Sequence, residues 1–351
     1  MLDYNASVLL IYTGGTIGMT EDLNTGALKS FDFDYLKGHV PELNRLKFNI
    51  DNIQFRHPID SSDMGPDEWK TIVRIIENNY EKYDGFVILQ GTDTMAYSAS
   101  ALSFMLENLS KPVILTGSQL PIGKIRTDGK ENLITALEIA VDKNPEGEAF
   151  VPEVCIFFQN LLMRGNRTTK INAANFKAFN SLNFPIIAEA GTYIRYKHEL
   201  IRRPFKGSKP EFHYLLDTNV AIIKLFPGIS TETLKAIITI PHLKGIVLET
   251  YGAGNAPSEN WFLDIIEEGV MKGIVTVNVT QCASGSVEME RYHAGKTLKN
   301  IGVLSGYDIT TEAAVTKLMF LFGNGLSSKE VKEQMILSLA GEITMYHELV
   351  Y

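Results

Sequence analysis

Short apolar runs alternate with amphipathic stretches along most of this chain, and the alternation restricts the folds open to it. The run GFVILQ at 85–90 is apolar on both faces, as a strand inside a parallel sheet is. In the stretch 65–85, apolar residues recur at the spacing of one helix face, with Pro66 placed to open the helix and Gly85 after its end. The other strand-like runs of this first series are residues 7–12, 111–118 and 153–160. Such alternation predicts an α/β fold with a doubly wound, mainly parallel sheet flanked by helices.

The alternation occurs in two series, which predicts two domains. The second series begins near Val220, and the stretch between the two series is rich in charge and has no clear period. A length of 351 residues also fits two domains better than one. We therefore expect a larger N-terminal α/β domain over residues 1–190, a linker over 191–218 and a smaller C-terminal α/β domain over 219–351.

Composition and charge exclude several classes of function. The net charge of -8 would repel nucleic acid and anionic membranes, and the basic residues of the linker come with no nucleic-acid motif. The two cysteines, Cys155 and Cys282, fit small buried hydrophobes better than a disulfide, and the seven histidines lack the spacing of a metal site. No run approaches the roughly 18 apolar residues of a membrane span, and the N-terminus has no basic leader region. We expect a soluble cytoplasmic protein that uses no metal.

Polar side chains gather where the apolar strands of the first series end. Thr16 follows the first strand in TGGT, Thr92 and Asp93 follow the second in GTDT, Ser118 follows the third in TGS, and Lys170 comes shortly after the fourth in RGNRTTK. In open parallel sheets, ligands bind beyond the carboxyl ends of the strands. The sequence therefore predicts that these loops converge on a single site.

The residue types at this site favour nucleophilic catalysis over cofactor binding. A threonine hydroxyl is a poor nucleophile until a base takes its proton, and Lys170 beside Asp93 could be that base for Thr92. The arrangement follows the logic of a Ser-His-Asp triad in other residues. The paired glycines of TGGT would let the chain turn so that Thr16 points into the site, and backbone N–H groups at Gly15 and Thr92 could face an oxyanion.

Other interpretations of the same residues remain open. TGGTIG could be the phosphate loop of a nucleotide-binding enzyme, although it fails the glycine spacings of the known motifs and leaves GTDT unexplained. Ser61 and Ser62 stand ahead of the helix expected from Pro66 and could simply cap it. Asp93 could be a turn residue, and Lys170 a surface charge.

Several motifs together resemble those of one enzyme family. IYTGGTIG and VILQGTDTMAYSASAL are similar to the two signature stretches of bacterial-type L-asparaginases. IDSSDM, LTGSQLP, RGNRTTK, YGAGNAP and TQCASG resemble more narrowly the type I, cytoplasmic branch of that family. The similarity runs from about Ser7 into the last helical stretches. The resemblance implies hydrolysis of L-asparagine to L-aspartate and ammonia, with no cofactor.

The resemblance also implies roles for the catalytic residues. Thr16 matches the family's first catalytic threonine, which is expected to attack the side-chain amide carbon and form a covalent β-aspartyl ester as ammonia leaves. Thr92, Asp93 and Lys170 match a second triad that would assist the nucleophile or activate the hydrolytic water.

A set of substrate-binding residues follows from the same resemblance. Asp60, Ser61 and Ser62 match the loop that holds the α-carboxylate of the substrate, and Asp93 would also meet its α-ammonium. Ser118 lies where the family contacts the departing amide. The complete expected set is Gly15, Asp60, Ser61, Ser62, Thr92, Asp93 and Ser118.

The chain departs from the family at a tyrosine that orients the first threonine from the loop after TGGT. Ala27 stands where that ring is expected. We expect Tyr292 to replace it, because in some type I-like relatives a tyrosine from this region reaches the site of the neighbouring subunit; Tyr12 and Tyr307 are alternatives. Sites shared at subunit contacts imply a homodimer or a homotetramer. If no tyrosine fills this role, the chain is expected to be a non-catalytic or weakly active asparagine-binding sensor.

A second departure concerns regulation. Some type I enzymes bind asparagine at an allosteric site that begins with an arginine before the YG turn. In this chain the expected remnant of that site consists of Thr169, Glu249, Thr250 and Tyr251. A carboxylate in place of the cation would repel the α-carboxylate of the effector, so homotropic activation is expected to be weak or absent.

Overall fold

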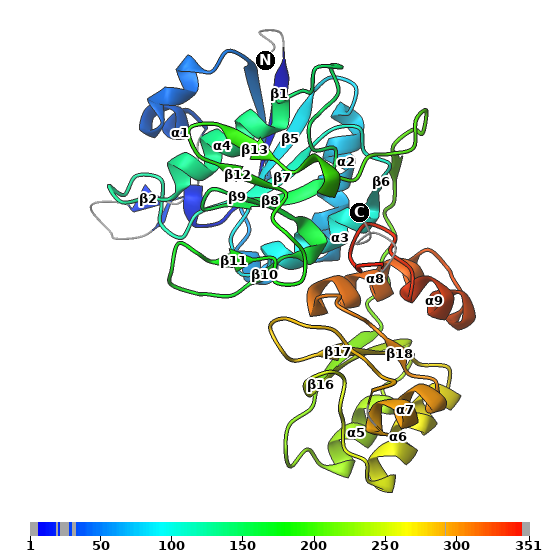
Figure 1. The fold of residues 1–351 in the computed structure, drawn as a ribbon. Coiled ribbons are helices and arrows are strands. Elements are labelled where there is room, and N and C mark those ends of the chain that lie inside the picture. The colour runs from blue at the N-terminus through cyan, green and yellow to red at the C-terminus, as the bar shows by residue number, and fades with distance from the viewer. Residues whose placement is uncertain (1–5, 19, 22–27, 30–32, 292, 346–351) are drawn as a thin grey trace. The chain divides into compact units, whose positions relative to one another are not determined.

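The computed structural model describes residues 6–18, 20–21, 28–29, 33–291 and 293–345 (Figure 1). The chain forms two units, the first built on a mainly parallel sheet and the second on a parallel sheet. The first unit comprises Met1–Ser181 and Pro185–Tyr214, and the second comprises Leu182–Phe184 and Leu215–Tyr351. The chain finally leaves the first unit between Tyr214 and Leu215, inside the segment 191–218. The predicted fold class, α/β with a larger N-terminal and a smaller C-terminal sheet, is confirmed.

The first unit is built on an eight-stranded sheet with a buried centre. In spatial order its strands are β13 (Ile194–Tyr196), β12 (Ala188–Ala190), β9 (Leu161–Arg164), β8 (Val154–Phe158), β7 (Val113–Thr116), β5 (Gly85–Leu89), β1 (Ser7–Tyr12) and β4 (Asn49–Gln54). The strands from β8 to β4 are parallel, whereas β9, β12 and β13 are antiparallel to their neighbours. Every residue of β5 and β7 is buried, which explains why these runs are apolar on both faces.

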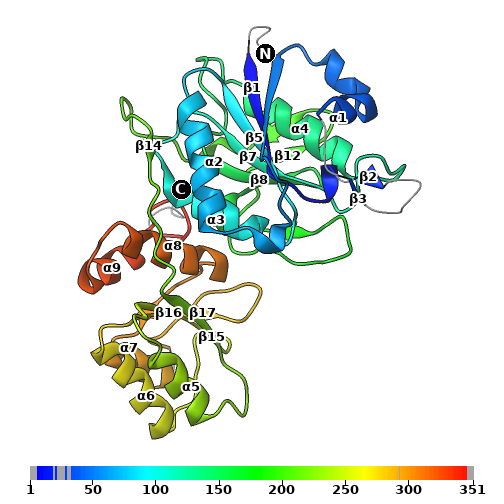
Figure 2. The same ribbon diagram turned by 180° about the vertical axis from the view of Figure 1, so that it is seen from behind.

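Helices cover both faces of this sheet. α4 (Gly129–Val141) packs on β1, β5 and β7, whereas α2 (Pro66–Asn79) and α3 (Met95–Met105) contact each other on the opposite face (Figures 1 and 2). α2 begins at Pro66, as expected, and buries its apolar stripe of Trp69, Ile72, Val73 and Ile76. The doubly wound arrangement predicted from the sequence is therefore present.

Smaller elements complete the first unit. They are α1 (Phe33–His39), β2 (Thr20–Glu21), β3 (Leu28–Lys29), β6 (Leu106–Glu107), β10 (Thr169–Lys170), β11 (Phe179–Asn180) and β14 (Glu211–Phe212). The short strands pair as antiparallel ribbons, β2 with β3, β10 with β11 and β14 with β6.

The second unit has a four-stranded parallel sheet covered on both faces. Its elements are β15 (Val220–Lys224), α5 (Thr231–Ile238), β16 (Gly245–Thr250), α6 (Asn260–Met271), β17 (Val275–Thr280), α7 (His293–Ile301), β18 (Leu304–Ser305), α8 (Thr311–Gly323) and α9 (Ser328–Met335). Ile246 and Leu248 of β16 share a core cluster with α5 and α6, whereas Gly245 faces Leu318 of α8. No helix within the described part of either unit has the length and apolar character needed to cross a bilayer.

Candidate active site

Loops at the carboxyl ends of four adjacent strands bring the predicted polar residues to one edge of the first sheet. Thr16 lies in the loop after β1, and Thr92 and Asp93 lie in the loop after β5. Ser61 follows β4, and Ser118 follows β7. These strands stand in the order β7, β5, β1 and β4, so the loops are neighbours. Ligands bind at this edge in open parallel sheets.

Glycines allow three of these loops to approach one another closely. Gly15 has a φ of +93°, and a Cβ atom there would lie 2.3 Å from the backbone nitrogen of Gly91. A Cβ atom at Gly91 would lie 2.6 Å from the Ser61 hydroxyl oxygen. The Thr94 hydroxyl donates to the Ser61 carbonyl across 2.5 Å. These contacts hold the loops after β1, β4 and β5 together and explain why TGGT needs its second glycine.

Thr92, Asp93 and Lys170 form one hydrogen-bonded cluster. Lys170 Nζ donates to Thr92 Oγ1 across 2.7 Å and to Asp93 Oδ1 across 2.6 Å. Lys170 is held here by the pairing of β10 with β11 and has a side chain 16% exposed, whereas the Asp93 side chain is 67% exposed. The cluster combines the hydroxyl, carboxylate and amine groups that a proton relay uses.

Gln119 is a further member of this cluster that the sequence did not identify. Its Oε1 accepts a hydrogen bond from the Thr92 hydroxyl across 3.1 Å. Its Nε2 donates to the backbone carbonyls of Ala173 and Asn175, both at 3.1 Å. Because two carbonyl oxygens face Nε2, a flipped amide would bring oxygen against oxygen, which fixes Oε1 toward Thr92. The motif LTGSQ contains Gln119, but only its serine carried a recognisable signal.

The loop after β7 is held in shape by Asp128. Its carboxylate accepts from the N–H groups of Gln119 and Leu120 at 3.0–3.2 Å. Ser118 is buried, and its hydroxyl donates to the Leu120 carbonyl across 2.5 Å. Since the hydroxyl hydrogen is engaged inside the loop, Ser118 would meet a ligand through its acceptor oxygen.

Asp60 caps a short 3-10 helix, Ser61–Asp63, that follows β4. The Asp60 carboxylate accepts from the hydroxyl of Ser62 and, at 2.9 Å, from its N–H, and these bonds hold the pKa of Asp60 below its usual value. Ser61 is buried, whereas Ser62 is exposed. The N-cap of α2 is Gly65, so the alternative that the serines cap this helix is wrong.

The expected orienting tyrosine, Tyr292, lies outside the described residues, and so does Ala27. Of the two alternatives, Tyr12 is buried in β1, and burial raises the pKa of its hydroxyl group. Tyr307 belongs to the second unit.

The expected allosteric remnant is divided between the units. Thr169 lies in β10 of the first unit, and Glu249, Thr250 and Tyr251 lie at the end of β16 in the second. The Glu249 carboxylate pairs with Lys224 across 3.1 Å and accepts from the Thr311 hydroxyl across 2.7 Å. Glu249 is therefore held by partners of its own unit.

Comparison with known proteins identifies the family. Residues 7–202 match the family model described as Asparaginase, N-terminal, and residues 219–335 match the Glutaminase/Asparaginase C-terminal domain. L-asparaginase 1 of Escherichia coli K12 is 42% identical over 96% of this chain and 98% of the relative. A 60 kDa lysophospholipase of Mus musculus is 39% identical over 96% of this chain, a match that covers 62% of that protein. The crystal structure of L-asparaginase I from Vibrio cholerae aligns with a TM-score of 0.87 and 39% identity, over 97% of this chain and 100% of that one. The chain belongs to the asparaginase family and to its type I branch.

Proposed function

We propose that this chain hydrolyses L-asparagine to L-aspartate and ammonia. The proposal rests on the cluster in which Lys170 binds Thr92 and Asp93, at the same sheet edge as Thr16. A hydroxyl, carboxylate and amine relay beside a second threonine suits cleavage of an amide through a covalent ester. The 42% identity to an L-asparaginase supports asparagine as the substrate, and the comparisons give no support to a non-catalytic sensor.

In the first half of the proposed reaction, the Thr16 hydroxyl oxygen attacks the side-chain amide carbon of asparagine. Backbone N–H groups at Gly15 and Thr92 stabilise the oxyanion that forms. The carbon–nitrogen bond then breaks, and ammonia leaves with the proton that Thr16 gave up. The acceptor oxygen of Ser118 holds the departing amide nitrogen. The substrate remains bound as a β-aspartyl ester of Thr16.

In the second half, water attacks the ester carbon, and Thr16 regains its proton as aspartate leaves. Thr92, Asp93 and Lys170 assist proton transfer in both halves. Lys170 Nζ lies 2.7 Å from Thr92 Oγ1 and 2.6 Å from Asp93 Oδ1, so it stands within reach of both groups for a proton relay. Water is the only co-substrate in these two steps.

The substrate's charged groups find complementary partners in the same loops. The turn that Asp60 shapes presents Ser61 and Ser62 to the α-carboxylate of asparagine. The exposed carboxylate of Asp93 attracts the α-ammonium group. Gly15, which has no side chain, allows the substrate to approach the backbone closely.

We also propose that the chain acts in the cytoplasm as a homodimer or homotetramer, with Tyr292 as the ring that orients Thr16. These three statements rest on the resemblance to the type I branch and to its shared sites. Light scattering of the purified protein would determine the number of subunits. Unchanged turnover in Tyr292→Phe would contradict the role of that tyrosine.

Ammonia release from L-asparagine and L-glutamine tests the proposed function. Thr16→Ala and Lys170→Met are each expected to lose roughly 10³-fold or more in kcat/KM. Lys177→Ala is the matched control, because Lys177 is an exposed lysine in the same segment. Asparagine binding without ammonia release would instead identify a sensor. Hydrolysis of a lysophospholipid without amide hydrolysis would assign the activity named for the mouse relative.

A further inference from the structure

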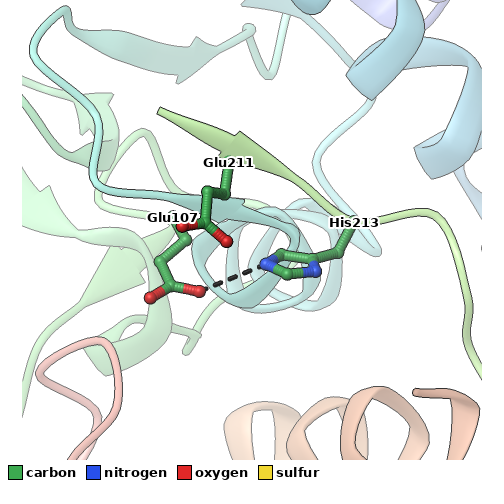
Figure 3. A group of neighbouring side chains, drawn as sticks. All are labelled: Glu107, Glu211 and His213. Carbon is green, nitrogen blue, oxygen red and sulfur yellow. Dashed lines mark hydrogen bonds and ion pairs between the residues drawn. The ribbon is translucent and has the colours of Figure 1, made fainter. Parts of the chain in front are cut away.

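We propose that Glu107, Glu211 and His213 bind a divalent transition-metal ion such as Zn²⁺, at a site separate from the candidate active site. One ligand atom from each residue, a carboxylate oxygen or a ring nitrogen, lies within 4.8 Å of the other two. Figure 3 shows the three side chains converging, Glu107 from β6, Glu211 from β14 and His213 from the residue that follows β14. None of them belongs to the loops that hold Thr16, Thr92 or Lys170.

The pairing of β14 with β6 places the three side chains on one face of the ribbon. Glu211 stands directly opposite Glu107 in the antiparallel register. The N–H of His213 donates to the Met105 carbonyl across 2.9 Å and extends the ladder by one residue. Because side chains alternate along a strand, Glu211 and His213 share a face with each other and with Glu107.

The opposite face of the ribbon is anchored to the first unit. Leu106 of β6 is 3% exposed, and the Phe212 ring packs edge-on against Tyr80 with centroids 5.5 Å apart. The ligand face remains accessible, since the Glu107 side chain is 55% exposed and the His213 side chain 25%. The backbone thus holds the three ligands together before any ion binds, which lowers the entropy lost on binding.

The charges at this face favour a divalent cation. Carboxylates placed directly opposite one another on paired strands repel. His213 Nε2 lies 3.1 Å from Glu107 Oε2, and a proton on the ring would offset only one of the two negative charges. A divalent ion would offset both. One imidazole nitrogen with carboxylate oxygens suits Zn²⁺, Co²⁺ or Ni²⁺, whereas Mg²⁺ and Ca²⁺ prefer oxygen ligands alone.

Binding would strengthen a weakly paired edge of the first unit. β14 has only two residues and is the last strand before the chain leaves this unit after Tyr214. An ion bound by Glu107 on β6 and by Glu211 and His213 on the segment that pairs with it would link the two sides of the ribbon. An ion that binds only the folded state raises thermal stability by mass action.

Equilibrium dialysis of the full-length, chelator-treated protein with Zn²⁺ tests the site. Wild type is expected to bind one more equivalent of Zn²⁺ than Glu211→Gln or His213→Gln. His242→Asn is the control, because His242 is exposed and its φ of +64° is one that asparagine adopts readily. The control should bind as much as wild type. The proposal would be overturned if all four proteins bound the same amount of Zn²⁺. It would also be overturned if Mg²⁺ at the same concentration displaced the Zn²⁺ bound to wild type.

Thermal unfolding with and without Zn²⁺ distinguishes a metal site from a purely structural histidine–glutamate contact. In the absence of metal, Glu211→Gln removes the repulsion and should melt at the same temperature as wild type or higher. With saturating Zn²⁺, wild type should melt at a higher temperature than Glu211→Gln. If Zn²⁺ did not raise the melting temperature of wild type relative to that of Glu211→Gln, the site would be refuted. Metal-free asparagine hydrolysis should be equal in all variants, which separates this test from that of the proposed function.

Discussion

Gln119 Oε1 accepts a hydrogen bond from the Thr92 hydroxyl across 3.1 Å. This bond fixes the direction from which the Thr92 oxygen can accept a second hydrogen bond. Lys170 Nζ donates to the same hydroxyl oxygen across 2.7 Å. The three residues therefore form a chain of hydrogen bonds in which Lys170 Nζ donates to the Thr92 hydroxyl and that hydroxyl donates to the Gln119 amide oxygen. Any proton transfer from Thr92 to Lys170 must first turn the hydroxyl away from Gln119.

Gln119→Leu is expected to lower kcat for asparagine about 10²-fold with a smaller effect on KM, because it frees the Thr92 hydroxyl and releases the 173–175 segment. Steady-state ammonia release at several pH values would measure both constants. Gln54→Leu, an exposed glutamine on the edge strand β4, is the control and should leave them unchanged. Equal kcat in Gln119→Leu and wild type would show that Gln119 has no positioning role.

Gly15→Ala is expected to reduce kcat/KM by about 10²-fold or more, because a Cβ atom would lie 2.3 Å from the Gly91 nitrogen and push the two loops apart. Gly207→Ala separates this clash from backbone strain, since Gly207 has a φ of +89° but no neighbouring atom within 4 Å of the added carbon. The control should lose only about 1 kcal/mol of stability and keep its activity. Similar losses of kcat/KM in both variants would show that backbone strain, and not the clash with Gly91, causes the effect.

The buried strands were predictable, and the polar edge elements were not. β5 and β7 are buried on both faces, so their sequences are continuously apolar and stand out. β4 reads NIDNIQ, is the edge strand beside β1, and exposes most of its residues, so no apolar alternation marks it. α7, by contrast, could have been recognised from Ala294, Leu298 and Ile301, which stand at i, i+4 and i+7, although it buries only Gly295 and Leu298.

Contacts between distant residues limited what the sequence could reveal about both sites. Thr16, Thr92 and Lys170 could be identified because they follow apolar strands and because their motifs resemble a family. The role of Gln119 depends on backbone carbonyls 54 and 56 residues further along the chain. Likewise, His213 and Glu107 are 106 residues apart and meet only because β14 pairs with β6. No local spacing encodes either contact.

The velocity of asparagine hydrolysis is expected to follow a hyperbola in substrate concentration. Glu249 presents a carboxylate, held by Lys224 and Thr311, where allosteric relatives are expected to present a cation. It would repel the α-carboxylate of a second asparagine. Initial rates over a wide range of concentration would test this expectation, and a strongly sigmoidal curve would contradict it.

The buried ion pair between Lys317 and Glu342 is expected to be a major determinant of stability in the second unit. Both side chains are fully buried, with Nζ and Oε1 2.7 Å apart, and Lys317 also donates to the Leu337 carbonyl across 2.5 Å. Glu342→Gln leaves the ammonium without its charge partner and should lower the free energy of unfolding by about 3–5 kcal/mol. Denaturant unfolding would measure the loss. Glu268→Gln, which breaks the exposed pair with Lys272, is the control and should have little effect.

The pH dependence of that loss tests whether Glu342 is ionised in the folded protein. Burial alone would raise the pKa of Glu342, but the Lys317 ammonium and the hydrogen bonds to the carboxylate outweigh it and hold the pKa below the usual value of 4.5. A carboxyl group whose pKa is lower in the folded state contributes its stability above the unfolded-state pKa and loses it as the pH falls through the folded-state value. The difference in unfolding free energy between wild type and Glu342→Gln should therefore be constant near neutral pH and shrink below about pH 4.5. If the unfolding free energy of wild type relative to Glu342→Gln instead rose as the pH fell, Glu342 would have to be protonated in the folded state. Its contact with Lys317 would then be a hydrogen bond between an acid and an amine rather than an ion pair.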